Sequence, residues 1–242
     1  MSGIRCSLLA FASLAVAGPA VAADFDNVLI IVADDMGSDK VGSYAGDVSN
    51  PTEARPTTTN LDRLAAAGVR FSDAWAMPMC SPTRAALNAG EYAYRTGVGN
   101  VIGEGSTTKL PLTPATLPQL ATDAGVVTAL FGKWHVGETT TTPHTPTTTA
   151  LDYKEYPVQA GYSSFLGNMT GEVDSYTNWL YTVSQAKSGN ATGYSTTATT
   201  MTASVTDRTT DDAESWMAAQ VAAGKRYMAV VTYHQPHATR GA

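Results

Sequence analysis

The sequence predicts an α/β fold in which helices flank a mainly parallel sheet. Two apolar, β-branched runs, 27–33 (NVLIIVA) and 227–233 (YMAVVTY), are typical of strands buried on both faces. Helical patterns lie between them, and strands that alternate with helices favour a parallel sheet. A chain of 242 residues, 43% of them hydrophobic, is long enough to bury such a core.

Two helices are expected in the first half of the chain. The segment 60–67 carries leucines that we expect to face the core, and Gly68 closes it. Further on, Ser81 can serve as the N-cap and Pro82 as the first residue of a helix that ends near Gly90. This helix would start just after residue 80, with its positive end toward that residue.

The second half predicts two more helices and two strands. The run 116–118 (TLP) opens a helix that Gly125 stops, and a strand over 126–131 follows. A helix over 207–223 then precedes the strand at 227–233.

Two stretches of low complexity are expected to be loops or peripheral excursions. Residues 139–149 are rich in Thr and Pro, and residues 184–204 in Ser, Thr, Gly and Ala. The sequence stops at Ala242, soon after the last predicted strand and without a closing helix. We therefore expect the chain to be the N-terminal portion of a catalytic domain, truncated at its C-terminus.

The first residues have the pattern of a cleavable signal peptide. Arg5 supplies a positive charge, 8–16 an apolar stretch too short to span a membrane, and 20–22 (AVA) a cleavage site. We expect residues 1–22 to be removed and residues 23–242 to be a periplasmic or secreted chain.

The charge balance excludes two kinds of partner. The formal net charge is -6, with 15 Lys and Arg against 21 Asp and Glu. There is no basic footprint for nucleic acid and no polybasic segment for an anionic membrane. A protein of this charge that handles an anionic substrate must concentrate cationic side chains at its site.

A pair of carboxylates indicates a cation site. Asp34 and Asp35 directly follow the first predicted strand, where ligands of open α/β sheets bind. Adjacent carboxylates repel each other unless a cation or a proton lies between them, and hard oxygen ligands suit Ca²⁺ or Mg²⁺. The alternative is a solvated turn.

Cys80 is the single cysteine of the predicted mature chain, because Cys6 lies in the signal peptide. It precedes a helix start, and Arg84 lies in the first turn, which favours a nucleophile beside an anion-binding site. The alternative is a buried cysteine before an ordinary helix. Lys133 and His135 are two residues apart, so in an extended segment both could face one anion. The alternative for this pair is solvation at a strand end.

Several motifs in order resemble the sulfatase family. The run 80–84 (CSPTR) resembles the signature whose cysteine is oxidised to formylglycine. Other characteristic segments of the family are resembled by 28–37 (VLIIVADDMG), 59–65 (TNLDRLA), 68–71 (GVRF), 95–98 (RTGV), 132–137 (GKWHVG), 161–176 and 236–237 (PH). The resemblance extends from about residue 26 to residue 237, and it implies an alkaline-phosphatase-like fold and a formylglycine-dependent, arylsulfatase-like hydrolase.

The resemblance implies a role for each matching position. Hydrated formylglycine at Cys80 would present a geminal diol, one oxygen of which attacks sulfur while the other later expels sulfate. Asp34, Asp35 and residue 80 would bind one divalent metal, Ca²⁺, and Arg84 would steady the formylglycine.

Three further positions complete the implied site. His135 would deprotonate the diol, Lys133 would bind sulfate, and His237 would assist departure of the leaving group. His234 would be a supporting or substrate-facing residue. The substrate would be a small-molecule or carbohydrate sulfate ester, and a formylglycine-generating enzyme would be the partner during maturation.

The sequence also departs from the family pattern. Glu91 stands where an arginine is usual, and Ala89 replaces a small hydroxyl residue. The Asp-Asn pair that should follow His237 is absent, which would leave a Ca²⁺ site short of oxygen ligands, so we expect a weakly stable and poorly active chain. Two alternatives stay open: a phosphonate or phosphodiester hydrolase of the same superfamily, and an inactive anion-binding fragment.

Overall fold

The computed structural model describes residues 26–46, 54–103, 106–137, 156–186 and 194–240. The predicted signal peptide, residues 1–22, and the Thr- and Pro-rich stretch 139–149 lie outside these ranges. Within the described ranges, no helix is both long and apolar enough to cross a membrane.

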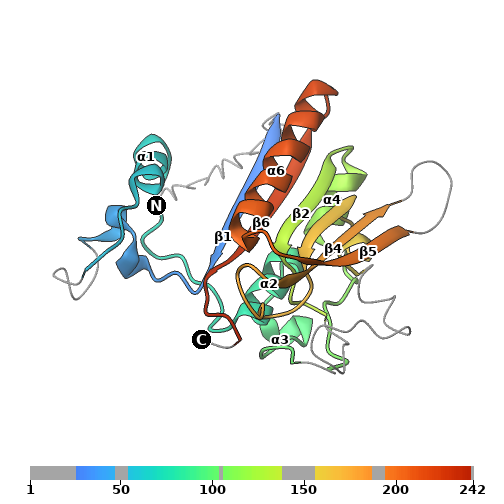
Figure 1. Cartoon of the computed structure of the whole chain (residues 1–242), viewed down its shortest axis with the longest axis horizontal. Helices are drawn as coiled ribbons and strands as arrows, with labels where there is room; N and C mark the ends of the chain where they lie inside the picture. The colour runs from blue at the N-terminus through green and yellow to red at the C-terminus, as the bar shows by residue number, and fades with distance from the viewer. Residues whose placement is uncertain (1–25, 47–53, 104–105, 138–155, 187–193, 241–242) are drawn as a thin grey trace, which may run out of the picture.

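A six-stranded mixed sheet forms the centre of the molecule (Figure 1). Its spatial order is β1-β6-β2-β3-β4-β5. The first four strands in this order are mutually parallel, whereas β4 and β5 run antiparallel to their neighbours. The predicted α/β class with a mainly parallel sheet is therefore confirmed. The strands are β1 (Asn27–Asp34), β2 (Val127–Lys133), β3 (Ser164–Asn168), β4 (Trp179–Ala186), β5 (Tyr194–Met201) and β6 (Tyr227–Pro236).

Helices lie on both faces of the sheet. Helix α6 packs across β2 and β6 (Figure 1), with Ala213 and Trp216 against Phe131 and Val231. On the opposite face a larger core gathers side chains of α2, α4 and the central strands around Trp134. The helices are α1 (Thr59–Ala67), α2 (Cys80–Ala89), α3 (Ala93–Thr96), α4 (Leu117–Asp123) and α6 (Val205–Ala222), with 3-10 turns η1 (Ser38–Lys40) and η2 (Gly42–Tyr44).

The structure corrects two predictions of burial. Strand β1 is not buried on both faces, because Leu29 is 48% and Ile31 56% exposed. It is also an edge strand, which pairs only with β6 among the described strands. The leucines of α1 do not face the core either: Leu61 is 40% and Leu64 67% exposed. Helix α1 packs against η2 and stands apart from the sheet (Figure 1).

The structure also corrects a prediction of loop. The stretch 184–204 contains the end of β4 and all of β5, which pair with each other in antiparallel register. The ladder is built by backbone hydrogen bonds and threonines, so it lacks the apolar alternation that would have marked it in the sequence.

Parallel pairing fixes where the chemistry-bearing residues meet. Strands β1, β2 and β6 run in one direction, so their carboxyl ends lie at the same edge of the sheet. Asp34 ends β1, Lys133 ends β2, and His237 directly follows β6. Ligands of open α/β sheets bind at this edge.

Candidate active site

Helix α2 carries Cys80 as its first residue, so it begins two residues earlier than predicted. Ser81 is not the N-cap: its hydroxyl accepts a hydrogen bond from the Ile102 amide at 3.0 Å. Met79 occupies the cap position and Thr83 donates to its carbonyl at 2.9 Å. Pro82 is tolerated inside the first turn because the first amides of a helix have no intrahelical partner. Cys80 itself is half-buried.

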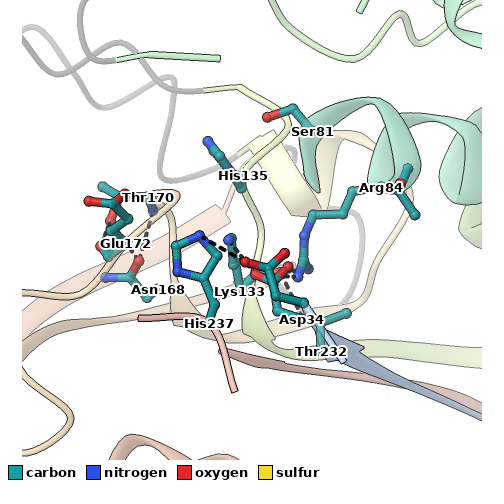
Figure 2. A network of polar contacts seen from close by, with 12 residues as sticks. Asp34, Ser81, Arg84, Lys133, His135, Asn168, Thr170, Glu172, Thr232 and His237 are labelled. Atoms are coloured by element: carbon teal, nitrogen blue, oxygen red, sulfur yellow. Dashed lines mark hydrogen bonds and ion pairs between the residues drawn. The ribbon is translucent and has the colours of Figure 1, made fainter. Parts of the chain in front are cut away.

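Asp34, Arg84 and Lys133 form a buried cluster of three charges (Figure 2), and two of them, Asp34 and Arg84, line a cavity together with Cys80. The Lys133 ammonium donates to Asp34 Oδ2, and Arg84 Nη2 lies 3.4 Å from the same oxygen. Arg84 Nη1 also donates to the Lys133 carbonyl at 2.7 Å. Burial lowers the pKa of Arg84, and the Asp34 carboxylate opposes that effect. With all three groups ionised the cluster has one excess positive charge, which is the local concentration that an acidic anion-handling protein requires.

Strand β2 has a kink at Gly132, the residue before Lys133. Gly132 has φ 94°, and a Cβ on it would lie 2.1 Å from the Thr232 carbonyl oxygen, so only glycine fits there. The Thr232 hydroxyl donates to the Lys133 carbonyl at 2.7 Å and so holds the backbone directly after the kink.

His135 is buried and neutral. Its Nε2 lies 3.0 Å from the Ile102 carbonyl, which can only accept, so Nε2 carries the proton and Nδ1 carries the lone pair. Within the described residues Nδ1 has no partner. Burial, followed by the charge of Lys133, lowers the pKa of His135 to about 3. The geometry differs from the predicted extended segment, because His135 has φ 52°.

His237 and His234 lie in different surroundings. His237 is partly exposed, its Nδ1 lies 2.7 Å from the Ala238 carbonyl, and its Nε2 lies 3.8 Å from Asp35 Oδ2. His234 is buried, with 4% of its surface exposed. Burial and the charge of Lys133 lower its pKa, and neither ring nitrogen has a partner among the described residues.

Two cavities meet at Cys80. One of about 440 Å³ is lined by Asp34, Asp35, Cys80 and Arg84. The other, of about 390 Å³, is lined by Cys80, Val101, Ile102, Gly103, His135, Gly171, Glu172, His237 and Arg240. Together with the ion pair of Lys133 to Asp34, these cavities bring all the predicted site residues to one edge of the sheet.

Two carboxylates are the candidate ligands for the metal that the sequence predicts. Asp34 and Asp35 line one cavity and offer hard oxygen donors, and the Asp35 side chain is 66% exposed. In the described ranges no group of three His, Cys, Asp or Glu side chains is close enough to hold a metal. Since Ca²⁺ takes about six to eight oxygen ligands, the two carboxylates fit it as a partial ligand set.

Sequence reasoning missed the residues of the loop between β3 and β4. Gly171 and Glu172 line the second cavity, and Arg240 enters it from the segment after β6. Their contacts join parts of the chain that are far apart in sequence, so no local pattern could have identified them. The only signal was the resemblance of the segment 161–176 to the family.

The fold and the site together define a sulfatase-like α/β domain, and comparison with known proteins identifies its family. The Sulfatase family profile matches residues 26–240. The chain is 40% identical to Arylsulfatase A of Bos taurus over 127 residues, or 52% of this chain and 24% of the relative. It is 34% identical to Steryl-sulfatase of Mus musculus over 174 residues, or 69% of this chain and 25% of the relative. The chain belongs to the sulfatase family.

Solved structures show the same fold. Ps i-CgsB covers 88% of this chain with a TM-score of 0.65 and 24% identity, and 46% of its own length is matched. BT4656, solved with its substrate D-glucosamine-2-N,6-O-disulfate, covers 88% of this chain with a TM-score of 0.59 and 18% identity, over 35% of its own length. The chain thus spans about a quarter of these curated relatives and less than half of these solved structures.

Proposed function

We propose that this chain carries the catalytic centre of an arylsulfatase-like sulfuric-ester hydrolase with Cys80 at the nucleophile position. The observation that carries the proposal is the place of Cys80, where a cavity with two carboxylates meets a cavity with two histidines. Family membership supports the reaction class, and the buried cations support an anionic substrate.

Two groups complete the proposed centre. A formylglycine made from Cys80 would supply a hydrated aldehyde as the nucleophile, and a divalent metal, Ca²⁺ by family resemblance, would supply charge that polarises the sulfate oxygens. Asp34 and Asp35 would hold the metal in part. Arg84 steadies Asp34 and the start of α2, since it bridges the two elements.

Four side chains bind the sulfate group and transfer protons. Lys133 and Arg84 bind the sulfate group through the excess positive charge of their cluster with Asp34. His135 is neutral near pH 7, so its Nδ1 accepts the proton of the attacking hydroxyl. His237 donates a proton to the leaving oxygen from the other cavity.

The proposed substrate is a sulfate ester of a small molecule or a carbohydrate. A relative of the same fold is named for a sulfated glucosamine substrate, which supports the carbohydrate class. The proposed compartment is the periplasm or the exterior, on the basis of the signal pattern in residues 1–22. A formylglycine-generating enzyme would act on Cys80 before folding.

The test combines mass spectrometry with a paired assay. The peptide that contains Cys80 should show the mass loss of thiol-to-aldehyde conversion, and the low turnover expected of the purified protein should be greater on 4-nitrophenyl sulfate than on an aryl phosphonate. Cys80→Ala should abolish turnover. Preference for the phosphonate would instead indicate the phosphonate hydrolase, and an unmodified thiol without turnover would indicate an inactive anion-binding fragment.

A further inference from the structure

The segment that carries His237 is held by the loop between β3 and β4. The Tyr176 phenol donates to the His237 carbonyl at 2.5 Å. Three residues later, the Arg240 amide donates to the Val173 carbonyl at 3.0 Å. Arg240 Nε also lies 3.9 Å from Glu172 Oε2 and 3.7 Å from Asp174 Oδ1. A backbone bond, a phenol bond and loose ion pairs thus join the two segments side by side.

The loop is itself anchored, so it can act as a support. The Tyr176 ring packs against the buried Val173, Trp179 and Val205, and the Tyr176 carbonyl accepts from the Val205 amide at 2.8 Å. At the other end of the loop, Thr170 bonds to the Asn168 side chain and to the Glu172 carbonyl (Figure 2). The position of the phenol is therefore set by a packed core and not by His237.

We propose that Tyr176 is a positioning residue for His237, one that fixes the distance between the His237 ring and the leaving oxygen of the substrate. The proposal rests on the proposed function, in which His237 is the proton donor. His237 lies beyond the last strand residue, Pro236, where the ladder no longer holds the backbone. The bond from Tyr176 to the His237 carbonyl replaces that support, and a misplacement of about 1 Å can cost roughly 100-fold in rate.

The key variant is Tyr176→Phe, which keeps the packed ring and removes the phenol oxygen. A nitrophenolate leaves as a stable anion and needs little protonation, whereas an alkoxide must be protonated. We expect kcat/KM for an alkyl sulfate to fall by roughly tenfold, in line with the loss of one partly buried hydrogen bond, and kcat/KM for 4-nitrophenyl sulfate to stay within about twofold of wild type. Tyr233→Phe is the matched control, because Tyr233 lies on β6 and its phenol bonds Thr210 of helix α6 at 2.9 Å rather than the His237 segment.

A double-mutant cycle separates positioning from general stability. His237→Ala should show the same selective loss on the alkyl sulfate, and adding Tyr176→Phe to it should cause no further loss. A residue that acts only on the fold would instead give additive losses on both substrates. Additive losses, or equal losses on both sulfates in Tyr176→Phe alone, would overturn the proposal.

Amide hydrogen exchange needs no substrate, so it tests the positioning role separately from the proposed function. The Arg240 amide should exchange with deuterium about tenfold faster in Tyr176→Phe, while amides of β2 and β6 keep their wild-type rates. Failure of every form of the protein to cleave sulfate esters would refute the proposed function alone. Wild-type exchange at Arg240 in the variant would refute the positioning role, whatever the activity.

Discussion

At the scale of single residues, the site uses burial in two opposite ways. Asp34 is buried with two cations on one oxygen, so its charge stays compensated. Among the described residues His135 is buried without a hydrogen-bonded carboxylate, so its ring stays neutral and its Nδ1 is available as an acceptor. One cationic group, Lys133, contributes to both results.

Acid should weaken the fold through His135. Its pKa is about 3 when folded against 6.5 in the unfolded chain, so the unfolded state binds more protons below pH 6.5, and stability falls with the pH from 6.5 toward 3. Between pH 7 and 5 this group alone should remove about 2 kcal/mol of unfolding free energy, and His234 acts in the same direction. Urea unfolding at the two pH values should show a smaller difference in His135→Gln than in wild type. An identical difference in the two proteins would contradict the assignment.

Gly171 leaves the space that the His135 ring fills. A Cβ at residue 171 would lie 2.4 Å from His135 Cε1. Gly171→Ala should therefore displace the ring and lower kcat by roughly 100-fold, with the fold retained by circular dichroism. The control is Gly103→Ala, because Gly103 lines the same cavity and a Cβ there meets nothing within 4 Å. Equal turnover of the two variants would exclude a steric role for Gly171.

At the scale of elements, the sequence predicted most strands and helices in their order along the chain, but it did not predict which strands pair in the sheet. The run 27–33 correctly predicted a strand, yet its apolar composition could not show that β1 pairs only with β6 among the described strands. Strand β5 was missed because its threonine-rich sequence has β propensity without hydrophobic alternation. Contacts such as that of Tyr176 with His237, 61 residues apart, depend on the finished fold.

Replacing Gly132 at the kink in β2 should lower the free energy of unfolding. Gly132→Ala places a Cβ against the Thr232 carbonyl and forces a non-glycine residue to φ 94°, which should destabilise the protein by at least about 2 kcal/mol. Because Lys133 follows directly, residual activity of the folded fraction should also fall. Thermal unfolding compared with Gly99→Ala, where a Cβ meets nothing within 4 Å, provides the check. A melting temperature equal to that of this control would show that the fold does not require glycine at the kink.

At the scale of the whole molecule, large apolar side chains remain exposed over separate elements. They include Leu29 and Ile31 of β1, Leu64 of α1, and Phe71 and Trp75 after it, the last 92% exposed. Strand β1 also has unpaired backbone groups along one side among the described strands. Such an edge favours association between chains.

One charge on β1 should reduce that association. Ile31→Lys adds a charge at a side chain that is 56% exposed, so it should raise the soluble fraction after concentration without lowering the melting temperature. Ile30→Lys is the matched control, since Ile30 packs against the core and its replacement should cost about 2 kcal/mol or more. Light scattering and thermal unfolding give the two measurements. Unchanged scattering in Ile31→Lys would exclude this edge as the cause of association.

The shared wall at Cys80 has a consequence for how such a protein can diversify. If the proposed function holds, the cavity lined by Asp35 would receive the sulfate group, and Glu172 and Arg240 in the other cavity would face the alcohol part of the ester. Substitutions at Glu172 and Arg240 could therefore change which alcohols are accepted, as long as His135 and His237 in the same cavity are kept. Selection for a new substrate would act on a few positions of this lining and leave the cavity with Asp34 and Asp35 unchanged.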